Sequence, residues 1–270
     1  MKTHFMVLRN TWATAVIVFC CAIRADASSV NWGTAANFAV LGGSTVTSTG
    51  ATVINGDLGV SPGSSITGFP PGIVNGTIHA ADAVAAQAQI DALAAYNMLL
   101  VFTGATDLTS KDLGGLTLSP GVYNFDTSAQ LTGQLVLNGQ GQANSTFVIK
   151  IGSTLTTAPA SSISLINGAT YDNVFFQVGS SATLGAGTEF LGNIVALTSD
   201  TLNTGATVNG RVFAINGAVT LDSNTINEVP EPSSAALFIS GLTLFLAARR
   251  RAIPKGQASC AEQSSGPLAE

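Results

Sequence analysis

Charge is scarce in this 270-residue chain, in which only 9% of the residues are Asp, Glu, Lys or Arg. Residues 28–228 contain eleven acidic residues and three basic ones, Lys111, Lys150 and Arg211. A nucleic-acid-binding surface needs clustered lysine and arginine, so three isolated basic residues exclude that class of protein. Glycine, serine, threonine, asparagine and alanine take the positions that charged residues usually hold on a protein surface.

Cysteine and histidine are also scarce. Cys20, Cys21 and Cys260 all lie outside residues 28–228, so we expect no disulfide within that part of the chain. His79 is its single histidine, which leaves no His/Cys set for a metal ion and no support for a serine–histidine triad. We therefore expect no enzymatic activity, no cofactor and no metal site.

The N-terminus has the features of an export signal. Lys2 and Arg9 precede a mostly apolar stretch, residues 11–23, and Ala25-Asp26-Ala27 fits the small-x-small cleavage pattern. The apolar stretch is shorter than the roughly 20 residues that cross a membrane. Residues 1–27 are therefore predicted to be a signal peptide that is removed on export.

The C-terminal part carries a second sorting feature. Val229-Pro230-Glu231-Pro232-Ser233-Ser234 is followed by an apolar run, residues 235–248, and by Arg249-Arg250-Arg251. This order resembles the bacterial PEP-CTERM signal over residues 229–251. The resemblance implies inner-membrane retention, cleavage near the Pro-Glu-Pro and release to the cell surface or matrix, with no transmembrane segment in the mature form. The alternative is a short anchor with positive-inside arginines. Residues 252–270 follow, with no predicted role.

Repeated phrases indicate the architecture of residues 28–228. Thr49-Gly50-Ala51-Thr52-Val53-Ile54-Asn55-Gly56 recurs, one residue shorter, as Thr204-Gly205-Ala206-Thr207-Val208-Asn209-Gly210. A Thr-Leu step also recurs, and its last three leucines are 18 and 19 residues apart; the steps are Thr154-Leu155, Thr183-Leu184, Thr201-Leu202 and Thr220-Leu221. This spacing predicts a solenoid of mainly β structure, whose successive coils stack on one another.

Short segments rich in β-branched and aromatic residues are bounded by glycine or asparagine, as at 173–178, 192–197 and 210–215. They are predicted to be equivalent strands of successive coils. If the leucine of each Thr-Leu step points into the core, the threonine before it points outward, because side chains alternate along a strand. The sequence therefore predicts a ladder of outward threonines.

Residues 78–102 interrupt the β pattern, because they are rich in alanine and free of glycine and proline. We expect one long α-helix packed along the side of the β stack. Helical spacing predicts that its buried face contains Ala83, Ala86, Ile90, Leu93 and Leu100.

The chain resembles the microbial ice-binding proteins over residues 31–227. The residues that carry the resemblance are 33–41 (GTAANFAVL), 56–63 (GDLGVSPG), 114–123 (GGLTLSPGVY), 173–178 (NVFFQV) and 207–211 (TVNGR). The resemblance implies an irregular right-handed parallel β-helix with a long helix alongside, and an N-terminal segment that joins the stack out of sequence order. It also implies adsorption to ice.

A threonine ladder suits that function. Neighbouring strands lie about 4.8 Å apart and alternate residues on one strand about 6.7 Å apart, so a flat face of Thr, Ser and Ala forms a two-dimensional grid. Each threonine has a methyl group that water solvates poorly and a hydroxyl group that holds water. A face that is already rigid orders bridging water at little entropic cost.

Some members of the family carry a Thr-(Ala/Gly)-x-(Thr/Asn) motif on the ice-binding face. Residues 49–52, 204–207 and 103–106 match it, whereas Ala186-Gly187-Thr188-Glu189 departs from it and introduces a charge. The candidate ice-binding residues are Thr45, Thr49, Thr52, Thr154, Thr183, Ser199, Thr201, Thr204, Thr207 and Thr220.

Two other functions stay open at this point. Threonine is common on outer strand faces without any ligand, so the same scaffold fits a structural or adhesive matrix protein that binds polysaccharide. Trp32 and Tyr171 are the candidate aromatic platforms for that binding. A polysaccharide-degrading enzyme would need a cleft with paired carboxylates. The sequence favours an exported, bacterial ice-binding protein whose partners are the ice surface and the export and sorting machinery.

Overall fold

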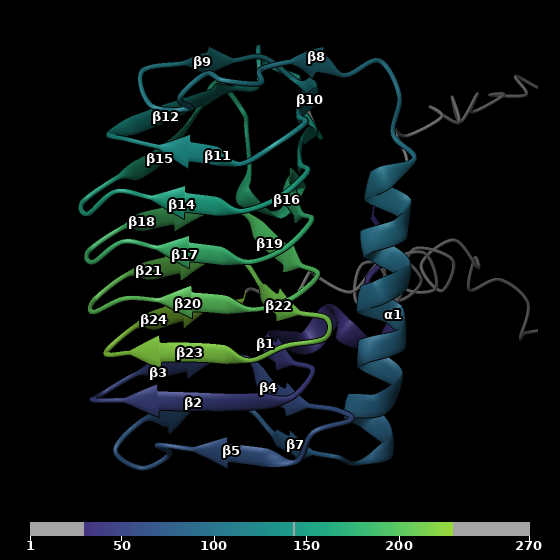
Figure 1. Cartoon of the computed structure of the whole chain (residues 1–270), viewed down its shortest axis with the longest axis vertical. Coiled ribbons are helices and arrows are strands. Elements are labelled where there is room, and N and C mark those ends of the chain that lie inside the picture. Colours follow the sequence, from purple (N-terminus) through teal and green to yellow (C-terminus); the bar gives the residue numbers. More distant parts are fainter. Residues whose placement is uncertain (1–29, 143, 229–270) are drawn as a thin grey trace, which may run out of the picture.

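Three parallel β-sheets, A, B and C, wind into a β-helix, and one long helix covers sheet A (Figure 1). The computed structural model describes residues 30–142 and 144–228. The helical elements are η1 (Gly33–Asn37), α1 (Ala83–Leu100) and η2 (Tyr171–Asn173). Each full coil contributes one strand to each sheet in turn, which matches the predicted mainly β solenoid with one long α-helix alongside.

The strands follow the same stacking order in all three sheets. Sheet A is β7 (Ile78–Ala80), β4 (Asp57–Val60), β1 (Phe38–Gly42), β22 (Val212–Ala214), β19 (Asn193–Ala196), β16 (Val174–Val178), β13 (Phe147–Ile151), β10 (Gly121–Phe125) and β8 (Thr106–Asp107). Sheet B is β5 (Ser65–Thr67), β2 (Thr45–Thr49), β23 (Val219–Asp222), β20 (Asp200–Leu202), β17 (Ala182–Leu184), β14 (Leu155–Thr157) and β11 (Ala129–Leu131). Sheet C is β6 (Ile73–Val74), β3 (Val53–Asn55), β24 (Thr225–Asn227), β21 (Thr207–Asn209), β18 (Glu189–Leu191), β15 (Ser162–Ile166), β12 (Gln134–Asn138) and β9 (Thr117–Leu118).

The N-terminal coils are stacked out of sequence order. β1 pairs with β22, β2 with β23 and β3 with β24, so the first coil lies directly on the last one. This arrangement confirms the order that the family resemblance implies. It also brings the two copies of the repeated phrase to the same corner of the coil, between sheets B and C.

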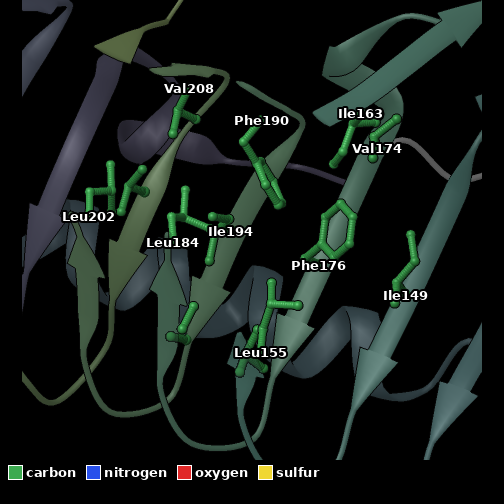
Figure 2. Close-up of a cluster of buried hydrophobic side chains, with 14 of the residues drawn as sticks. Ile149, Leu155, Ile163, Val174, Phe176, Leu184, Phe190, Ile194, Leu202 and Val208 are labelled. Carbon is green, nitrogen blue, oxygen red and sulfur yellow. The ribbon is translucent and has the colours of Figure 1, made fainter. Parts of the chain in front are cut away.

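The inward side chains of the three sheets form one continuous apolar core (Figure 2). The leucines of the four Thr-Leu steps are all at most 1% exposed, as predicted: Leu155, Leu184, Leu202 and Leu221. Phe176 of sheet A and Phe190 of sheet C pack against each other with ring centroids 4.8 Å apart. Burial of each such side chain contributes about 1.5–3 kcal/mol to the free energy of unfolding, so stacked coils need no disulfide.

The helix is shorter than the predicted 78–102. Residues 78–80 form β7, which pairs with β4, because the chain completes another strand of sheet A before it turns. The helix then begins at Ala83, where the Asp82 carboxylate accepts a hydrogen bond from the Ala85 N–H at 2.8 Å. An aspartate in this position is a favourable N-cap.

The predicted buried face of the helix was wrong. Ala83, Ala86, Ile90, Leu93 and Leu100 are exposed, and the buried face instead consists of Ala85, Ala88, Ala92, Ala95, Tyr96 and Leu99. The reason is the outer surface of sheet A, which presents large side chains together with Trp32 from the N-terminal segment. Small residues on the helix let its backbone approach these bulky groups and fill the space at the density of a protein interior.

Asparagines at the corner between sheets C and A form a hydrogen-bonded ladder. Asn227 donates to Asn209 at 2.8 Å, Asn55 to Asn227 at 2.6 Å and Asn75 to Asn55 at 2.7 Å. Each bond contributes about 1 kcal/mol and joins side chains of adjacent coils. The ladder fixes the spacing of the coils that surround the junction of the N- and C-terminal segments.

Candidate functional site

Sheet B carries a row of outward threonines, one from each of six adjacent strands. Thr201 pairs with Thr183 on one neighbouring strand and with Thr220 on the other. Each of these threonines pairs in turn with a threonine of the next parallel strand. We call this set the threonine row; it consists of Thr67, Thr47, Thr220, Thr201, Thr183 and Thr156, and Gln130 follows it in the outermost strand.

A second outward row lies two residues earlier in each coil. Thr45 pairs with Ser65, and the other members immediately precede paired residues of sheet B. Thr154 donates a hydrogen bond to the Ser128 hydroxyl at 2.8 Å, and the Ala218 N–H donates to the Ser199 hydroxyl at 3.2 Å. We call this set the serine row: Ser65, Thr45, Ala218, Ser199, Ser181, Thr154 and Ser128.

The two rows lie on sheet B, whose strands stack down one side of the molecule (Figure 1). None of their members is charged. Their members are half-buried or exposed, so methyl and hydroxyl groups reach water while the backbone is held in the parallel ladder. Stacked strands repeat at about 4.8 Å and alternate residues at about 6.7 Å, which produces a grid of small groups. A surface of this kind orders water without the strong local hydration that a charge imposes.

Six of the predicted candidates lie in these rows. Thr183, Thr201 and Thr220 are in the threonine row, and Thr45, Thr154 and Ser199 are in the serine row. Thr154 points outward as predicted, but it is not level with the other three Thr-Leu threonines, because Leu155 pairs with Ala182 and Thr156 with Thr183.

Sequence reasoning missed Thr47, Thr67 and Thr156, because none of them precedes a leucine. In the coil of Thr156 the next inward residue is Thr157, which is 3% exposed and shares a hydrogen bond with Thr188 at 2.8 Å. A search for outward threonines that allowed any small inward neighbour would have found Thr156.

The prediction for Thr52 was wrong. Its side chain is fully buried, accepts a hydrogen bond from the Ser48 hydroxyl at 2.7 Å and accepts another from the Asn224 N–H at 3.2 Å. The two copies of the repeated phrase are offset by one residue, since Thr207 pairs with Thr225 and Thr225 with Val53. Thr52 therefore closes the corner of the coil from inside.

The remaining candidates, Thr49, Thr204 and Thr207, lie outside the two rows. Thr49 and Thr204 are exposed at the corner between sheets B and C, where the Thr204 hydroxyl donates to the Asp222 carboxylate. That hydrogen bond holds the pKa of Asp222 below its ordinary value, so a carboxylate borders this edge of sheet B. Thr207 is on sheet C. The third match of the motif, residues 103–106, leads from the helix into β8 of sheet A.

Sheets A and C lack this uniform character. α1 packs over sheet A with the apolar cluster that includes Trp32, Phe175 and Phe213. The outward row of sheet C mixes a charge with large apolar groups and consists of Ser162, Glu189, Thr207, Thr225, Val53 and Ile73. Sheet B is therefore the regular face that the fold leaves open.

A buried acid lies directly beneath the two rows. Asp200 points into the core between Ala182 and Val219, is fully buried, and neither carboxylate oxygen has a hydrogen-bond partner among the described residues. Burial raises the pKa of Asp200 well above its ordinary value of 3.8. Burial thus favours the neutral form of this acid, which lies in the chain between two outward members of the rows, Ser199 and Thr201.

Removing this acid should change how stability depends on pH. Because the folded-state pKa of Asp200 is raised, the folded protein binds its proton more tightly, and stability is lost as pH rises above the unfolded value. Asp200→Ala, which reproduces Ala182, should raise the free energy of unfolding at pH 8 by about 1–3 kcal/mol. The gain should shrink towards pH 4. Urea unfolding of both proteins at pH 4, 6 and 8 measures it, and a gain independent of pH would contradict the assignment.

Three further observations bear on the class of protein. Trp32 is 3% exposed and lies under Arg211, with the guanidinium carbon 5.3 Å from the ring centroid, so it is no platform for a sugar. In the parts of the chain that the structure describes, no group of three or more His, Cys, Asp or Glu side chains is placed to hold a metal ion. No helix within residues 30–142 or 144–228 is long and apolar enough to cross a membrane.

The fold is that of a β-helix of the ice-binding type, and comparison with known proteins agrees. The chain belongs to the ice-binding-like family, which it matches over residues 40–227. Residues 228–252 match the PEP-CTERM protein-sorting motif, which directs the protein out of the cytoplasm to the cell surface or the extracellular space.

Named relatives and solved structures extend this result. An ice-binding protein of Nostoc sp. (strain HG1) is 57% identical over 247 residues, which cover 86% of this chain and 91% of that one. Ice-binding protein 1 of Shewanella frigidimarina is 35% identical over 73% of this chain, which spans 26% of that longer protein. Crystal structures of ice-binding proteins from an Antarctic biological consortium and from Antarctomyces psychrotrophicus are 48% and 42% identical, with TM-scores of 0.72 and 0.73. They cover 74% and 76% of this chain, and 91% and 100% of their own.

Proposed function

We propose that this protein adsorbs to ice through the threonine row and the serine row of sheet B. The observation that carries the proposal is the register of six threonines across six adjacent strands. Membership of the ice-binding-like family, with relatives named ice-binding proteins, supports the same activity. The protein acts outside the cytoplasm, where it restrains the growth or recrystallisation of ice.

The fixed positions of the threonine side chains on sheet B support adsorption to ice without any chemical reaction. Parallel backbone ladders hold the threonine side chains in fixed positions before ice is met, so little conformational entropy is lost on adsorption. The methyl groups disfavour disordered water between rungs, and the hydroxyl groups each anchor a water molecule. Together they hold a first layer of water whose repeat approximates that of a crystal face, and this layer joins the ice.

The other partners follow from the same evidence. The sorting motif makes the export and sorting machinery the second partner of the chain.

Asp57, Asp107, Asp112 and Asp126 are spread over three coils, with Asp107 and Asp112 in the same one, and this spread disfavours the paired carboxylates of a sugar-cleaving enzyme. A matrix protein that binds polysaccharide is disfavoured because Trp32 is buried.

Residues 28–228 should inhibit ice recrystallisation and shape ice crystals into facets. The measurement is the growth rate of crystals in a frozen sucrose film, together with the shape of a single crystal held near its melting point. A folded sample that leaves crystals round and growing at the control rate would contradict the proposed function. Bovine serum albumin at the same mass concentration is the control.

A further inference from the structure

The outer face of α1 is apolar, exposed and uncharged. Val84, Ile90, Leu93 and Leu100 are each at least 40% exposed, as is Val101 at the end of the helix. The other exposed helix residues are Ala83, Ala86, Gln87, Ala94 and Asn97, so this face carries no charge. A soluble protein rarely leaves a continuous strip of large aliphatic side chains in water unless something covers it.

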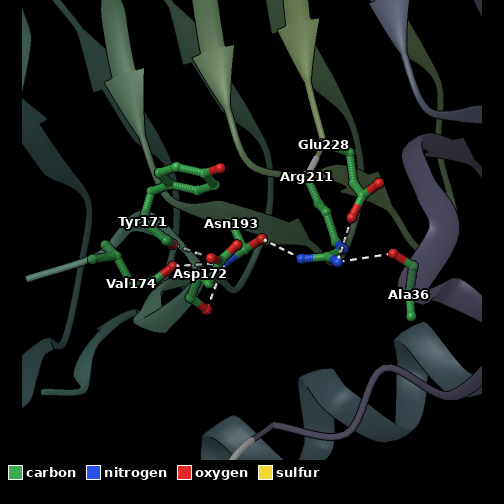
Figure 3. A network of polar contacts seen from close by, with 7 residues as sticks. All are labelled: Ala36, Tyr171, Asp172, Val174, Asn193, Arg211 and Glu228. Carbon is green, nitrogen blue, oxygen red and sulfur yellow. Dashed lines mark hydrogen bonds and ion pairs between the residues drawn. The ribbon is translucent and has the colours of Figure 1, made fainter. Parts of the chain in front are cut away.

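The described chain ends beside this helix. The Glu228 carboxylate forms a buried ion pair with Arg211 at 2.7 Å, and Arg211 also donates to the Ala36 carbonyl at 2.8 Å (Figure 3). Ala36 is part of η1, which packs on α1 and is joined to it by the Thr34 N–H, which donates to Asp91 at 2.6 Å. Glu228, the last described residue, is therefore linked to the middle of α1 through Arg211 and η1.

We propose that the outer face of α1 binds the apolar run of this chain, residues 235–248, before the sorting motif is processed. Six residues, 229–234, separate the run from Glu228 and reach at most about 20 Å. Half the circumference of a helix about 10–12 Å across is shorter than this. The linker is thus longer than the path around α1 from its inner to its outer face.

The size and chemistry of the two surfaces agree. α1 has 18 residues and is about 27 Å long, and the apolar run of 14 residues contains no charged side chain. Lipid headgroups are a poorer match, because a helix that lies on a membrane surface usually borders its apolar face with lysine and arginine, and α1 has neither. Docking keeps both apolar surfaces out of water until the run is delivered to the membrane or removed.

Cysteine cross-linking tests the contact in the full exported chain with Cys260→Ser as background. The pair Leu93→Cys and Leu242→Cys should form an intramolecular disulfide at least about tenfold faster than the control pair Thr183→Cys and Leu242→Cys, because docking raises the local concentration of the two thiols. Equal rates for the two pairs, or disulfides formed only between chains, would overturn the proposal. The second outcome would point to a dimer through α1.

A second measurement does not depend on the cysteine variants. Ile90→Asn with Leu93→Asn should free residues 235–248 and speed chymotrypsin cleavage at Phe238 and Phe245 several-fold. Ile73→Asn, which changes an exposed isoleucine on sheet C, is the matched control and should leave the rate unchanged. Unchanged cleavage in the α1 variant would also overturn the proposal. Both α1 changes lie away from sheet B, so ice activity should stay normal.

Discussion

Thr201→Glu is expected to reduce the inhibition of ice recrystallisation at least about tenfold, which corresponds to about 1.4 kcal/mol of adsorption free energy. Thr201 lies in the interior of the threonine row, where it pairs with Thr183 on one side and Thr220 on the other. Glutamate is longer than threonine and charged, so it lifts the ice surface from neighbouring rungs and imposes its own hydration shell. The fold should be unaffected, because the side chain points outward.

The matched control is Thr225→Glu. Thr225 is also a half-buried threonine in a short parallel strand, but it belongs to sheet C. The same substitution there adds the same charge and strand perturbation, and it should leave recrystallisation inhibition within about twofold of the unmodified protein. Circular dichroism and the unfolding midpoint of both variants establish that they are folded. Equal loss of activity in the two variants would argue against sheet B as the ice-binding face.

The largest effect on stability is expected from breaking the buried ion pair of Arg211 and Glu228, in which both side chains are 1% exposed. Arg211→Met should lower the free energy of unfolding by about 3–5 kcal/mol, because it leaves the Glu228 carboxylate buried without its cation. It also removes hydrogen bonds to Asn193 and Ala36, at 3.2 and 2.8 Å. The N-terminal segment and the last coil would then lose a shared anchor.

A double variant separates the charge from the packing. Arg211→Met with Glu228→Gln removes the unpaired charge while keeping side chains of similar size, so it should recover part of the loss. Urea unfolding at pH 7 gives the three free energies. A single variant that costs less than about 1 kcal/mol, or a double variant that is less stable than the single one, would contradict this role for the pair.

Sequence reasoning predicted the direction of a side chain correctly where that direction depends only on neighbouring residues in the same strand. Alternation along a strand placed Leu184, Leu202 and Leu221 inside, and so placed the threonines before them outside. It also placed Thr154 outside, but in this coil Leu155 pairs with Ala182, so Thr154 belongs to the serine row and Thr156 to the threonine row.

The errors at the helix and at Thr52 have non-local causes. Periodicity favoured Ile90 and Leu93 for the buried face, but the bulky outer surface of sheet A selects the alanine face instead. Thr52 is buried because the first coil packs on the last one, where its hydroxyl meets the Asn224 N–H, 172 residues away in the chain. The family resemblance supplied the stacking order, and register in the folded protein then decided which threonines share a row.

The most direct test measures whether fluorescently labelled protein is incorporated into a growing ice front. It compares variants that each carry one glutamate on a different side of the molecule. The variants are Thr201→Glu on sheet B, Thr225→Glu on sheet C and Leu93→Glu on the outer face of α1. The account predicts that the unmodified protein, the sheet C variant and the α1 variant all enter the ice, whereas the sheet B variant stays in the liquid. If the sheet B variant entered the ice while the sheet C variant stayed in the liquid, sheet B would not be the ice-binding face.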